Sequence, residues 1–584
     1  MNNKPHNEKN RLTIGEAYRL GRDHQRAGRA GEASAIFRKI LAAEPRHADA
    51  IFALGIIGFR EGRLDEAEAL FRRAASIKPG DGKHSLNLGV VLQRKGDLEA
   101  AEESYRQSIS AMPDNPVAHY SLGVALQQQG RLVEAEQAYR RALELNPDDL
   151  KAHTNLAWAL CRLQRLDDAE SELAPLLQNN PDDPSVLLCH GQLLRSRQDF
   201  VAAEAPLRRS LELREDVSTL LALTSVLRHN NRTGEAEPLA RRTLELAGEQ
   251  PSVLWELVYS HRFEVGDPLL ETLEQMPEKA GLYEATEIGR LFMLAKAYDD
   301  LDRFEAASAC ARRANDMVFR QHPFAIEPQL KAIDLTMARF RVPAICPVPS
   351  TDNPAPVFIV GESRAGKTLV ESLLASKRGV YAAGESRDLL DALGTHGQQR
   401  TGSPDAGLQE AHFTPEQSAS FGSGFLELLR ARAPGARWVT STMPGYYMLV
   451  GFIFSTLPGA RVIHCRRDPL DQCVEMYLRL YGSAKMSFTS NPATLAAYYA
   501  AYRRLMVHWR SVYGDRMLEI DYEHLVANPN VAARRLYDHC GIDAGAGKST
   551  VAFNDRAVGR GKLYAPHLGD LFEALGVNGL NGCG

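Results

Sequence analysis

The chain has few cysteines for its length, and their positions exclude two kinds of architecture. Eight cysteines occur among 584 residues, and no two of them form a Cys-x-x-Cys pair. Zinc sites and disulfide frameworks both depend on cysteines at characteristic spacings. We therefore expect no metal site and no disulfide scaffold, and the composition fits a reducing compartment.

Long apolar runs and a strong net charge are also absent. No run of about 18 apolar residues occurs, so no membrane-spanning helix is expected. The opening segment MNNKPHNEKN is polar and lacks the apolar core of a signal peptide. A net charge of −4 gives no general attraction for nucleic acid. These absences predict a cytoplasmic protein that binds no nucleic acid, and the length predicts two or more domains.

The first half of the chain follows a 34-residue period. Small residues, prolines and aromatics recur at this spacing, which indicates pairs of antiparallel helices. The small residues let two helices approach closely, the aromatics fill the gap, and the prolines end the second helix. The repeated positions are Gly21, Gly55, Gly89 and Gly123; Ala33, Ala67, Ala101, Ala135, Ala169 and Ala203; Phe37, Phe71, Tyr105 and Tyr139; and Pro45, Pro79, Pro113, Pro147 and Pro181.

This pattern resembles the tetratricopeptide repeat. It predicts an α-solenoid over residues 12–340, preceded by a disordered segment at 1–11. Residues 217–250 and 288–321 keep parts of the pattern, whereas 251–287 are the least regular. Such arrays present a concave groove, and we expect a protein or peptide partner in it. The alternative for this half is a spacer or an oligomerisation module.

A second domain is expected after the repeats. Residues 341–356 contain five prolines and read as a linker, which places this domain at 357–584. Within it, short apolar runs alternate with helical patterns, which predicts an α/β fold with a mostly parallel sheet. The runs start at Val357, Arg437, Ala460 and Met517. In such sheets, ligands bind at the loops that leave the carboxyl ends of the strands.

The most specific motif follows the first of these runs. Gly361, Gly366, Lys367 and Thr368 match the pattern G-x-x-x-x-G-K-[ST] of a phosphate-binding loop. Such a loop aims the free N–H groups of a helix N-terminus at one anion, and glycine lets the backbone approach that anion closely. The motif alone fits either a nucleoside-triphosphate site or a sulfate-donor site.

Three further motifs follow in order: Ala-Gly-Glu-x-Arg-Asp-Leu at 383–389, Val-Ile-His-Cys-Arg-Arg-Asp-Pro-Leu-Asp at 462–471, and Ile-Asp-Tyr-Glu-x-Leu-Val-Ala-Asn-Pro at 520–529. Together with Phe-Ile-Val-Gly-x-x-Arg-x-Gly-x-Thr-Leu at 358–369, they resemble bacterial sulfotransferases fused to tetratricopeptide repeats, which are related to tyrosylprotein sulfotransferases. The resemblance implies a P-loop-type α/β enzyme. It would move a sulfuryl group from 3′-phosphoadenosine-5′-phosphosulfate to a hydroxyl acceptor, such as a protein or peptide presented by the repeats.

The resemblance also implies roles for single residues. Glu385 corresponds to the catalytic base, and Arg364 and Lys367 are catalytic candidates beside it. A carboxylate can take the acceptor proton within hydrogen-bond reach, and guanidinium groups suit a phosphate dianion. The implied donor-binding positions are Ser363, Arg364, Ala365, Gly366, Lys367, Thr368 and Leu369 for the 5′-phosphosulfate, Arg467 and Arg479 for the 3′-phosphate, and Glu475 and Tyr522 near the nucleotide.

Three positions depart from the family pattern. Glu475 stands in place of a serine and brings a carboxylate toward the 3′-phosphate. Ser441-Thr442 replaces an Asp-Lys pair, which removes a cation. Lys367 replaces a threonine and restores a positive charge, so we hypothesise that it compensates for the missing lysine.

Two other functions stay open from the sequence. Glu475 favours a non-catalytic repeat scaffold with a degenerate sulfotransferase domain. A kinase or ATPase that uses nucleoside triphosphates needs an acidic Mg²⁺ ligand at a strand end. Residues 437–444 offer no such ligand, and 461–468 place two arginines before their aspartate. His464 lies inside an apolar run, so we expect a core residue there rather than a base.

Overall fold

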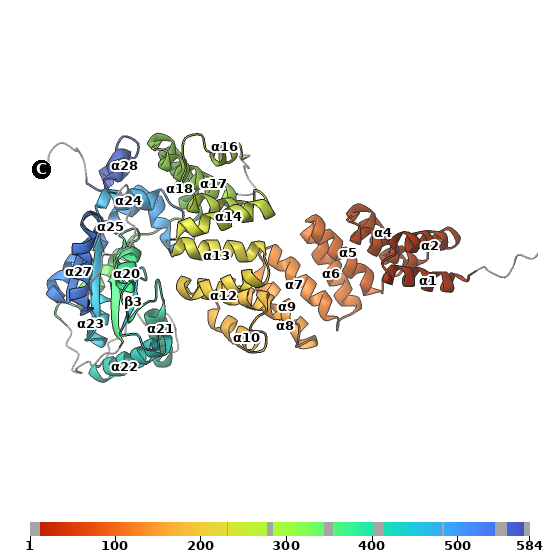
Figure 1. The fold of residues 1–584 in the computed structure, drawn as a ribbon, viewed down its shortest axis with the longest axis horizontal. Coiled ribbons are helices and arrows are strands. Elements are labelled where there is room, and N and C mark those ends of the chain that lie inside the picture. Colours follow the sequence, from red (N-terminus) through yellow and green to blue (C-terminus); the bar gives the residue numbers. More distant parts are fainter. Residues whose placement is uncertain are drawn as a thin grey trace, which may run out of the picture. The chain divides into compact units, whose positions relative to one another are not determined.

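The computed structural model describes residues 12–230, 232–276, 284–343, 354–401, 414–481, 484–543 and 558–576. It divides into two compact units, Met1–Ser196 and Arg197–Gly584, which are described separately (Figure 1). The segment expected to be disordered, 1–11, and most of the expected linker, 341–356, lie outside the described residues.

The first unit consists of antiparallel helix pairs, as the repeat pattern predicts. Each pair is joined by a short turn, and successive pairs pack side by side. The helices are α1 (Ile14–Arg26), α2 (Ala30–Ala43), α3 (Ala48–Arg60), α4 (Leu64–Ile77), α5 (Gly82–Lys95), α6 (Leu98–Ala111), α7 (Pro116–Gln128), α8 (Leu132–Leu145), α9 (Leu150–Arg162), α10 (Leu166–Asn179) and α11 (Pro184–Ser196). The predicted solenoid fold is confirmed for this unit.

Contacts between a glycine and an aromatic ring set the spacing within the first four pairs, from α1–α2 to α7–α8. Tyr105 is completely buried, and a Cβ atom added to Gly89 would lie 2.6 Å from Cε1 of its ring. Gly123 and Tyr139 repeat the same contact one unit later, also at 2.6 Å. Only a residue without a side chain allows this approach, which explains why glycine and aromatic recur together.

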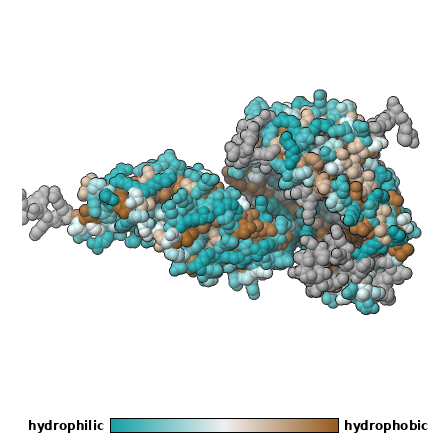
Figure 2. Space-filling model, turned by 180° about the vertical axis from the view of Figure 1, so that it is seen from behind, coloured by the Kyte–Doolittle hydropathy of each residue, from teal (hydrophilic) through white to brown (hydrophobic). Residues whose placement is uncertain are grey.

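Ion pairs join neighbouring repeats on the outside of this packing. Arg131 contacts Glu102 of the preceding repeat at 2.7 Å, and Arg165 contacts Glu136 at 2.8 Å. In the visible face of Figure 2 the repeat helices carry mostly hydrophilic side chains, and apolar atoms gather in smaller patches. The repeats therefore bury their apolar residues against one another and expose charge.

The second unit begins with helices that continue the repeat pattern. They are α12 (Phe200–Leu213), α13 (Val217–His229), α14 (Thr233–Ala247), α15 (Pro251–Ser260), α16 (Pro268–Gln275), α17 (Glu284–Asp300), α18 (Phe304–Gln321) and α19 (Glu327–Arg339). The expected irregular region at 251–287 contains the short helices α15 and α16. The unit expected at 288–321 forms the hairpin of α17 and α18.

A parallel sheet follows, which confirms the predicted fold class. Its order is β2-β3-β1-β4-β5, and every pair of neighbours is parallel. The strands are β1 (Ala355–Val360), β2 (Val380–Ala382), β3 (Trp438–Ser441), β4 (Arg461–Arg466) and β5 (Met517–Asp521). The helices are α20 (Lys367–Ala375), α21 (Asp388–Thr401), α22 (Pro415–Arg432), α23 (Val450–Thr456), α24 (Pro469–Tyr477), α25 (Pro492–Tyr513), α26 (Tyr522–Ala527), α27 (Pro529–Cys540) and α28 (Gly569–Ala574).

The central strand β1 is buried on both faces. Val357 and Ile359 pack with residues of α20 and α27, whereas Phe358 and Val360 pack with residues of α22 to α25. Side chains of a strand alternate between faces, so a continuous apolar run is what a doubly covered strand requires. None of the described helices combines the length and the apolar character needed to cross a membrane.

The last repeat helices share a core with the sheet. Ala295, Ala307 and Ile333, from α17, α18 and α19, belong to the same buried cluster as Phe358. Polar contacts reinforce this packing, because the Asn315 amide donates to the Tyr477 carbonyl at 2.8 Å. Helix α24 ends at Tyr477, the residue whose carbonyl accepts this hydrogen bond.

The glycine–aromatic contact leads to a test of the repeat packing. Changing Gly89 to Ala places a methyl group against the buried ring of Tyr105, and overpacking of this kind costs about 1–3 kcal/mol. Gly31→Ala is the matched control, because open space surrounds Gly31 on α2 and alanine favours a helix by up to about 1 kcal/mol. Urea unfolding of the full chain should show a lower midpoint for Gly89→Ala alone. Equal midpoints for the two variants would contradict the packing.

Candidate functional site

The predicted phosphate-binding loop joins β1 to α20 at the carboxyl edge of the sheet. Gly366 is the N-cap of α20 and has a φ of 89°, a left-handed conformation that glycine adopts without strain. Gly361 has a φ of 150°, and a Cβ atom there would lie 2.8 Å from the carbonyl oxygen of Cys465 on β4. Both glycines are therefore required by the backbone, and the first N–H groups of α20 are available to an anion.

Side chains from α24, from the residue after β4 and from the start of α20 donate hydrogen bonds to the carbonyl groups of this loop. The Gln472 amide on α24 donates to the Ser363 carbonyl at 2.7 Å, and Arg467 Nη1 donates to the Arg364 carbonyl at 2.9 Å. Lys367 Nζ donates to the carbonyls of Gly361 at 2.9 Å and Glu362 at 3.1 Å. The loop is thus fixed before any ligand binds, and the Lys367 ammonium group lies inside it.

Three arginines surround one carboxylate beside the loop. Glu475 lies 3.7 Å from Arg364, 2.5 Å from Arg467 and 3.5 Å from Arg479. Three guanidinium groups and one carboxylate leave this arginine cluster with a net charge of +2. Burial acts to raise the pKa of Glu475, but the charges of the arginines outweigh it and lower the pKa to about 2. Glu475 is therefore ionised throughout the physiological pH range.

The acidic residues next to Arg467 have other partners. Asp468 is the N-cap of α24 and accepts hydrogen bonds from two backbone N–H groups of that helix. Asp471 accepts from the N–H groups of Gly559 and Gly561, both at 2.6 Å. Arg467 pairs instead with Glu475, eight positions further along the chain. The sequence does not indicate which carboxylate pairs with Arg467, because Asp468, Asp471 and Glu475 all lie within eight positions of it.

An aromatic ring lies between the loop and the arginine cluster. Tyr522, the first residue of α26, packs so closely on Gly366 that a Cβ atom there would lie 2.6 Å from its ring. The guanidinium carbon of Arg467 lies 4.9 Å from the centre of the same ring. The structure thus brings together Tyr522, Arg467, Arg364 and the loop, although Tyr522 and Arg364 are 158 positions apart in the sequence.

Glu385 lies in the loop that follows β2. Burial raises the pKa of Glu385, while the charges of Lys367 and Arg364 oppose this shift. The loop is tied to β3, because the Thr442 N–H donates to the Gly384 carbonyl at 2.7 Å. Ser441 and Thr442, which stand where the family has an Asp-Lys pair, therefore lie against the loop that carries Glu385.

Glu371 is a site residue that the sequence analysis missed. It is buried on α20, where its Oε1 accepts hydrogen bonds from the Gly384 N–H at 3.1 Å and the Thr440 hydroxyl at 2.6 Å. Burial raises its pKa to about 7, against the effect of these hydrogen bonds, and the charge of Glu385 adds to the rise. The signal in the sequence was a glutamate between the apolar residues Val370 and Leu373.

The structure also places His464, which lies on β4. Its ring nitrogens contact the Tyr502 hydroxyl at 2.8 Å and Glu519 at 3.1 Å. Burial lowers the pKa of His464. It is a core residue on the sheet, as the sequence predicts.

The raised pKa of Glu371 predicts how stability depends on pH. An unfolded glutamate has a pKa of about 4.3, so between about pH 4.5 and 7 only the folded state holds the proton. The free energy of unfolding should therefore fall by about 3 kcal/mol across this window as the pH rises. Glu371→Gln stays neutral and keeps both hydrogen bonds, so its unfolding free energy should lack this loss. Urea unfolding at pH 5 and pH 8 tests this, with Glu427→Gln on the exposed face of α22 as the control. An unchanged pH dependence in Glu371→Gln would refute the assignment.

Known protein families match the repeats and the sheet domain separately. The model of the sulfotransferase family matches residues 356–545, and tetratricopeptide-repeat models match 18–82, 86–149, 126–193 and 289–317. A curated "Uncharacterized protein" of Aquifex aeolicus (strain VF5) is 23% identical over 376 residues, which cover 61% of this chain and 48% of that protein. The chain therefore spans about half the length of this relative.

Similar solved structures cover the repeats. A tetratricopeptide repeat protein from Parabacteroides merdae is 18% identical with a TM-score of 0.38, over 42% of this chain and 98% of that chain. Pseudomonas aeruginosa pilF is 22% identical with a TM-score of 0.30, over 35% of this chain and 94% of that chain. YrrB, a TPR protein with an unusual peptide-binding site, is 20% identical with a TM-score of 0.28, over 32% of this chain and 96% of that chain. The chain thus joins a domain of the sulfotransferase family to an array of tetratricopeptide repeats.

Proposed function

We propose that this chain is a sulfotransferase that uses 3′-phosphoadenosine-5′-phosphosulfate as donor and a hydroxyl group as acceptor. The observation that carries the proposal is the convergence of the loop, the arginine cluster and Glu385 at the carboxyl edge of one parallel sheet. The match to the sulfotransferase family supports it. Both nucleotide phosphates of the donor need cationic partners, and this edge supplies them.

The residues present fit such a donor. The N-terminus of α20 and residues Ser363 to Leu369 suit the 5′-phosphosulfate, since the first N–H groups of a helix favour an anion. Arg467 and Arg479 suit the 3′-phosphate, and Tyr522 lies beside Arg467. The arginine cluster keeps a net charge of +2 even with Glu475 ionised, which it offers to the two phosphate groups of the donor together.

Glu385 is the proposed base. When bound, the donor supplies a sulfuryl group, whose bond to the phosphate oxygen is exchanged for a bond to the acceptor oxygen. Glu385 takes the proton that the acceptor hydroxyl loses. Its raised pKa brings its basicity closer to neutral pH, which favours proton transfer. Arg364, Lys367 and the N–H groups of α20 stabilise the negative charge that develops on the departing phosphate oxygen.

Phosphoryl transfer is less well supported. A kinase or ATPase requires Mg²⁺ held by carboxylates near the phosphates. Among the described residues, the one grouping of three potential metal ligands is Asp49, Asp81 and His84, in the first unit. Asp468 and Asp471, the carboxylates that follow β4, instead hold backbone N–H groups. Sulfuryl transfer needs no such metal site.

The acceptor is proposed to be a protein or peptide that the repeats present. Tetratricopeptide repeats generally mediate protein interactions, and this chain carries them in both units. In the described part of the first unit, the large exposed apolar residues are few: Leu12, Ile14, Leu20, Val117 and Val133. Recognition in the groove would therefore depend mainly on polar contacts.

Replacing Glu385 tests the proposed reaction. Glu385→Gln keeps the shape of the side chain but cannot accept a proton, so transfer from a ³⁵S-labelled donor should fall by at least about 100-fold. Tyrosine peptides, saccharides and p-nitrophenol are suitable acceptors. Thermal stabilisation by 3′-phosphoadenosine-5′-phosphate should equal that of the wild type, because the arginine cluster is intact.

The same binding assay separates the other functions. Stabilisation of the wild type by ATP with Mg²⁺, but not by the bisphosphate, would support a nucleoside-triphosphate enzyme. Stabilisation by neither nucleotide would support a non-catalytic scaffold. Full transfer activity in Glu385→Gln would remove Glu385 from the mechanism while leaving the donor site in place.

Glu475 favours the scaffold alternative, and its replacement gives a second test. A carboxylate and a phosphate a few ångströms apart repel each other by about 1–4 kcal/mol. Glu475→Gln should therefore bind the bisphosphate at least about fivefold more tightly in calorimetry, with faster transfer at low donor concentration. Glu573→Gln, on the exposed side of α28, is the control for loss of one charge. A loss of binding in Glu475→Gln would show instead that Glu475 is needed to hold the arginines.

A further inference from the structure

A repeat helix reaches the arginine cluster. Tyr259 lies near the end of α15, and the guanidinium carbon of Arg479 is 5.8 Å from the centre of its ring. Arg228 of α13 lies 6.0 Å from the same ring centre. The charges of Arg479, Arg228 and Arg364 all act on the Tyr259 hydroxyl. The ring therefore lies between cations of the repeat region and cations of the sheet domain.

The position of Tyr259 is fixed from its own side. The ring of Trp255, one turn earlier on α15, lies 4.4 Å away, and the Tyr259 hydroxyl donates to the Phe292 carbonyl on α17 at 3.4 Å. Arg228 is held in turn, since it contacts Glu256 at 3.0 Å. Tyr259 therefore presents a rigid aromatic face to Arg479.

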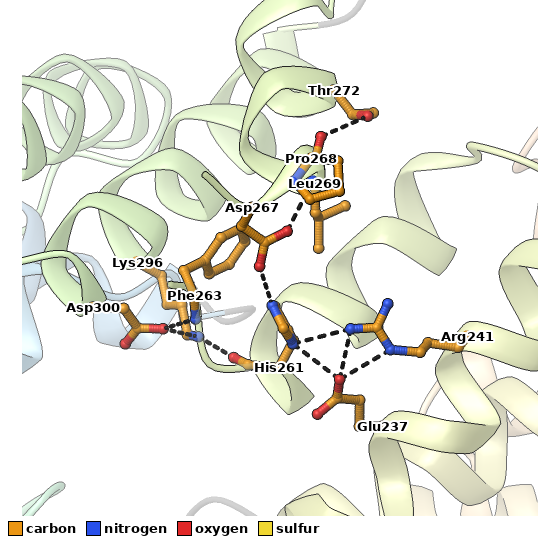
Figure 3. Close-up of polar contacts among 10 residues, drawn as sticks. All are labelled: Glu237, Arg241, His261, Phe263, Asp267, Pro268, Leu269, Thr272, Lys296 and Asp300. Atoms are coloured by element: carbon orange, nitrogen blue, oxygen red, sulfur yellow. Dashed lines mark hydrogen bonds and ion pairs between the residues drawn. The ribbon is translucent and has the colours of Figure 1, made fainter. Parts of the chain in front are cut away.

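The segment after α15 anchors this end of the helix. His261 lies between two carboxylates, with Glu237 at 2.9 Å from one ring nitrogen and Asp267 on the other (Figure 3). Lys296 reaches from α17 to the His261 carbonyl and to Asp300, at 2.5 Å from the latter. This network lies where the repeat pattern is interrupted, and it holds His261, two positions after Tyr259.

Arg479 depends on this support more than its neighbours do. Arg467 is almost fully buried and has a 2.5 Å contact with Glu475, whereas Arg479 is partly exposed and lies 3.5 Å from the same carboxylate. Arg479 also lies beyond the end of α24, where its N–H makes only a long hydrogen bond of 3.4 Å to the Met476 carbonyl. A long side chain with one weak ion pair loses much conformational freedom when it is ordered, and an aromatic face reduces that loss.

We propose that Tyr259 is a positioning residue for the donor site: its ring holds Arg479 in place for the 3′-phosphate. The inference rests on the proposed function, because it takes the arginine cluster as the site of that phosphate. It gives the repeat region a part in donor recognition in addition to its part in binding a partner. The interrupted repeat at α15 and α16 is then the feature that brings the ring to the cluster.

Two substitutions of Tyr259 in the full chain test this. Tyr259→Phe keeps the ring, so its affinity for 3′-phosphoadenosine-5′-phosphate should stay within about twofold of the wild type. Tyr259→Leu removes the ring and should weaken that affinity about fivefold, the effect of one cation–π contact. Affinity for adenosine 5′-monophosphate, which lacks the 3′-phosphate, should be the same in all three proteins. Calorimetry measures both nucleotides.

The control separates positioning from general damage. Tyr298→Leu removes another repeat tyrosine, whose hydroxyl donates to Glu274 at 2.8 Å, and should leave the ratio of the two affinities unchanged. Unchanged affinities of Tyr259→Leu for both nucleotides would overturn the role of Tyr259 and leave the donor site standing. An equal loss for both nucleotides would show a structural role only and also overturn it. If the wild type binds neither nucleotide, the proposed function fails, and the inference fails with it.

Discussion

The contact between Arg467 and Glu475 is the interaction on which the candidate site depends. Arg467 leaves the end of β4, and its side chain is only 5% exposed. It joins the Arg364 carbonyl in the loop, Glu475 on α24 and the ring of Tyr522 on α26. A buried guanidinium is costly unless it is paired, so these contacts hold the three elements in one arrangement. The loop, the helix and the ring are thereby fixed before a ligand binds.

The repeats and the sheet are less separate than a linker would suggest. One compact unit starts at Arg197, within the repeats, and α17 to α19 share buried residues with the sheet. A repeat stack must cover the apolar face of its last helices, because exposed apolar surface is unfavourable. The sheet domain provides this cover, with Arg560 paired to Asp299 at 3.0 Å at the border. The same packing brings Tyr259 to Arg479.

The parts of the fold that could be predicted are those set by short-range spacing. Gly89 and Tyr105 are 16 residues apart and contact each other inside one repeat, so a sequence period reveals them. The loop glycines likewise occupy fixed positions between one strand and one helix. The contact of Glu475 with Arg364 could not be predicted in this way, because the two residues are 111 positions apart. That contact depends on β4 lying beside β1, and the strand order is set by packing of the whole domain.

Lys367 links the anion cradle to the proposed base. Its ammonium group donates to two carbonyls of its own loop, so its charge is held in place and does not swing toward a ligand as a flexible surface lysine does. That fixed charge counteracts the effect of burial on the pKa of Glu385. A base must be ionised before it can accept a proton, yet it must be basic enough to do so. Burial supplies the basicity and Lys367 favours the ionised form, so a lysine where the family has threonine acts on both the loop and the base.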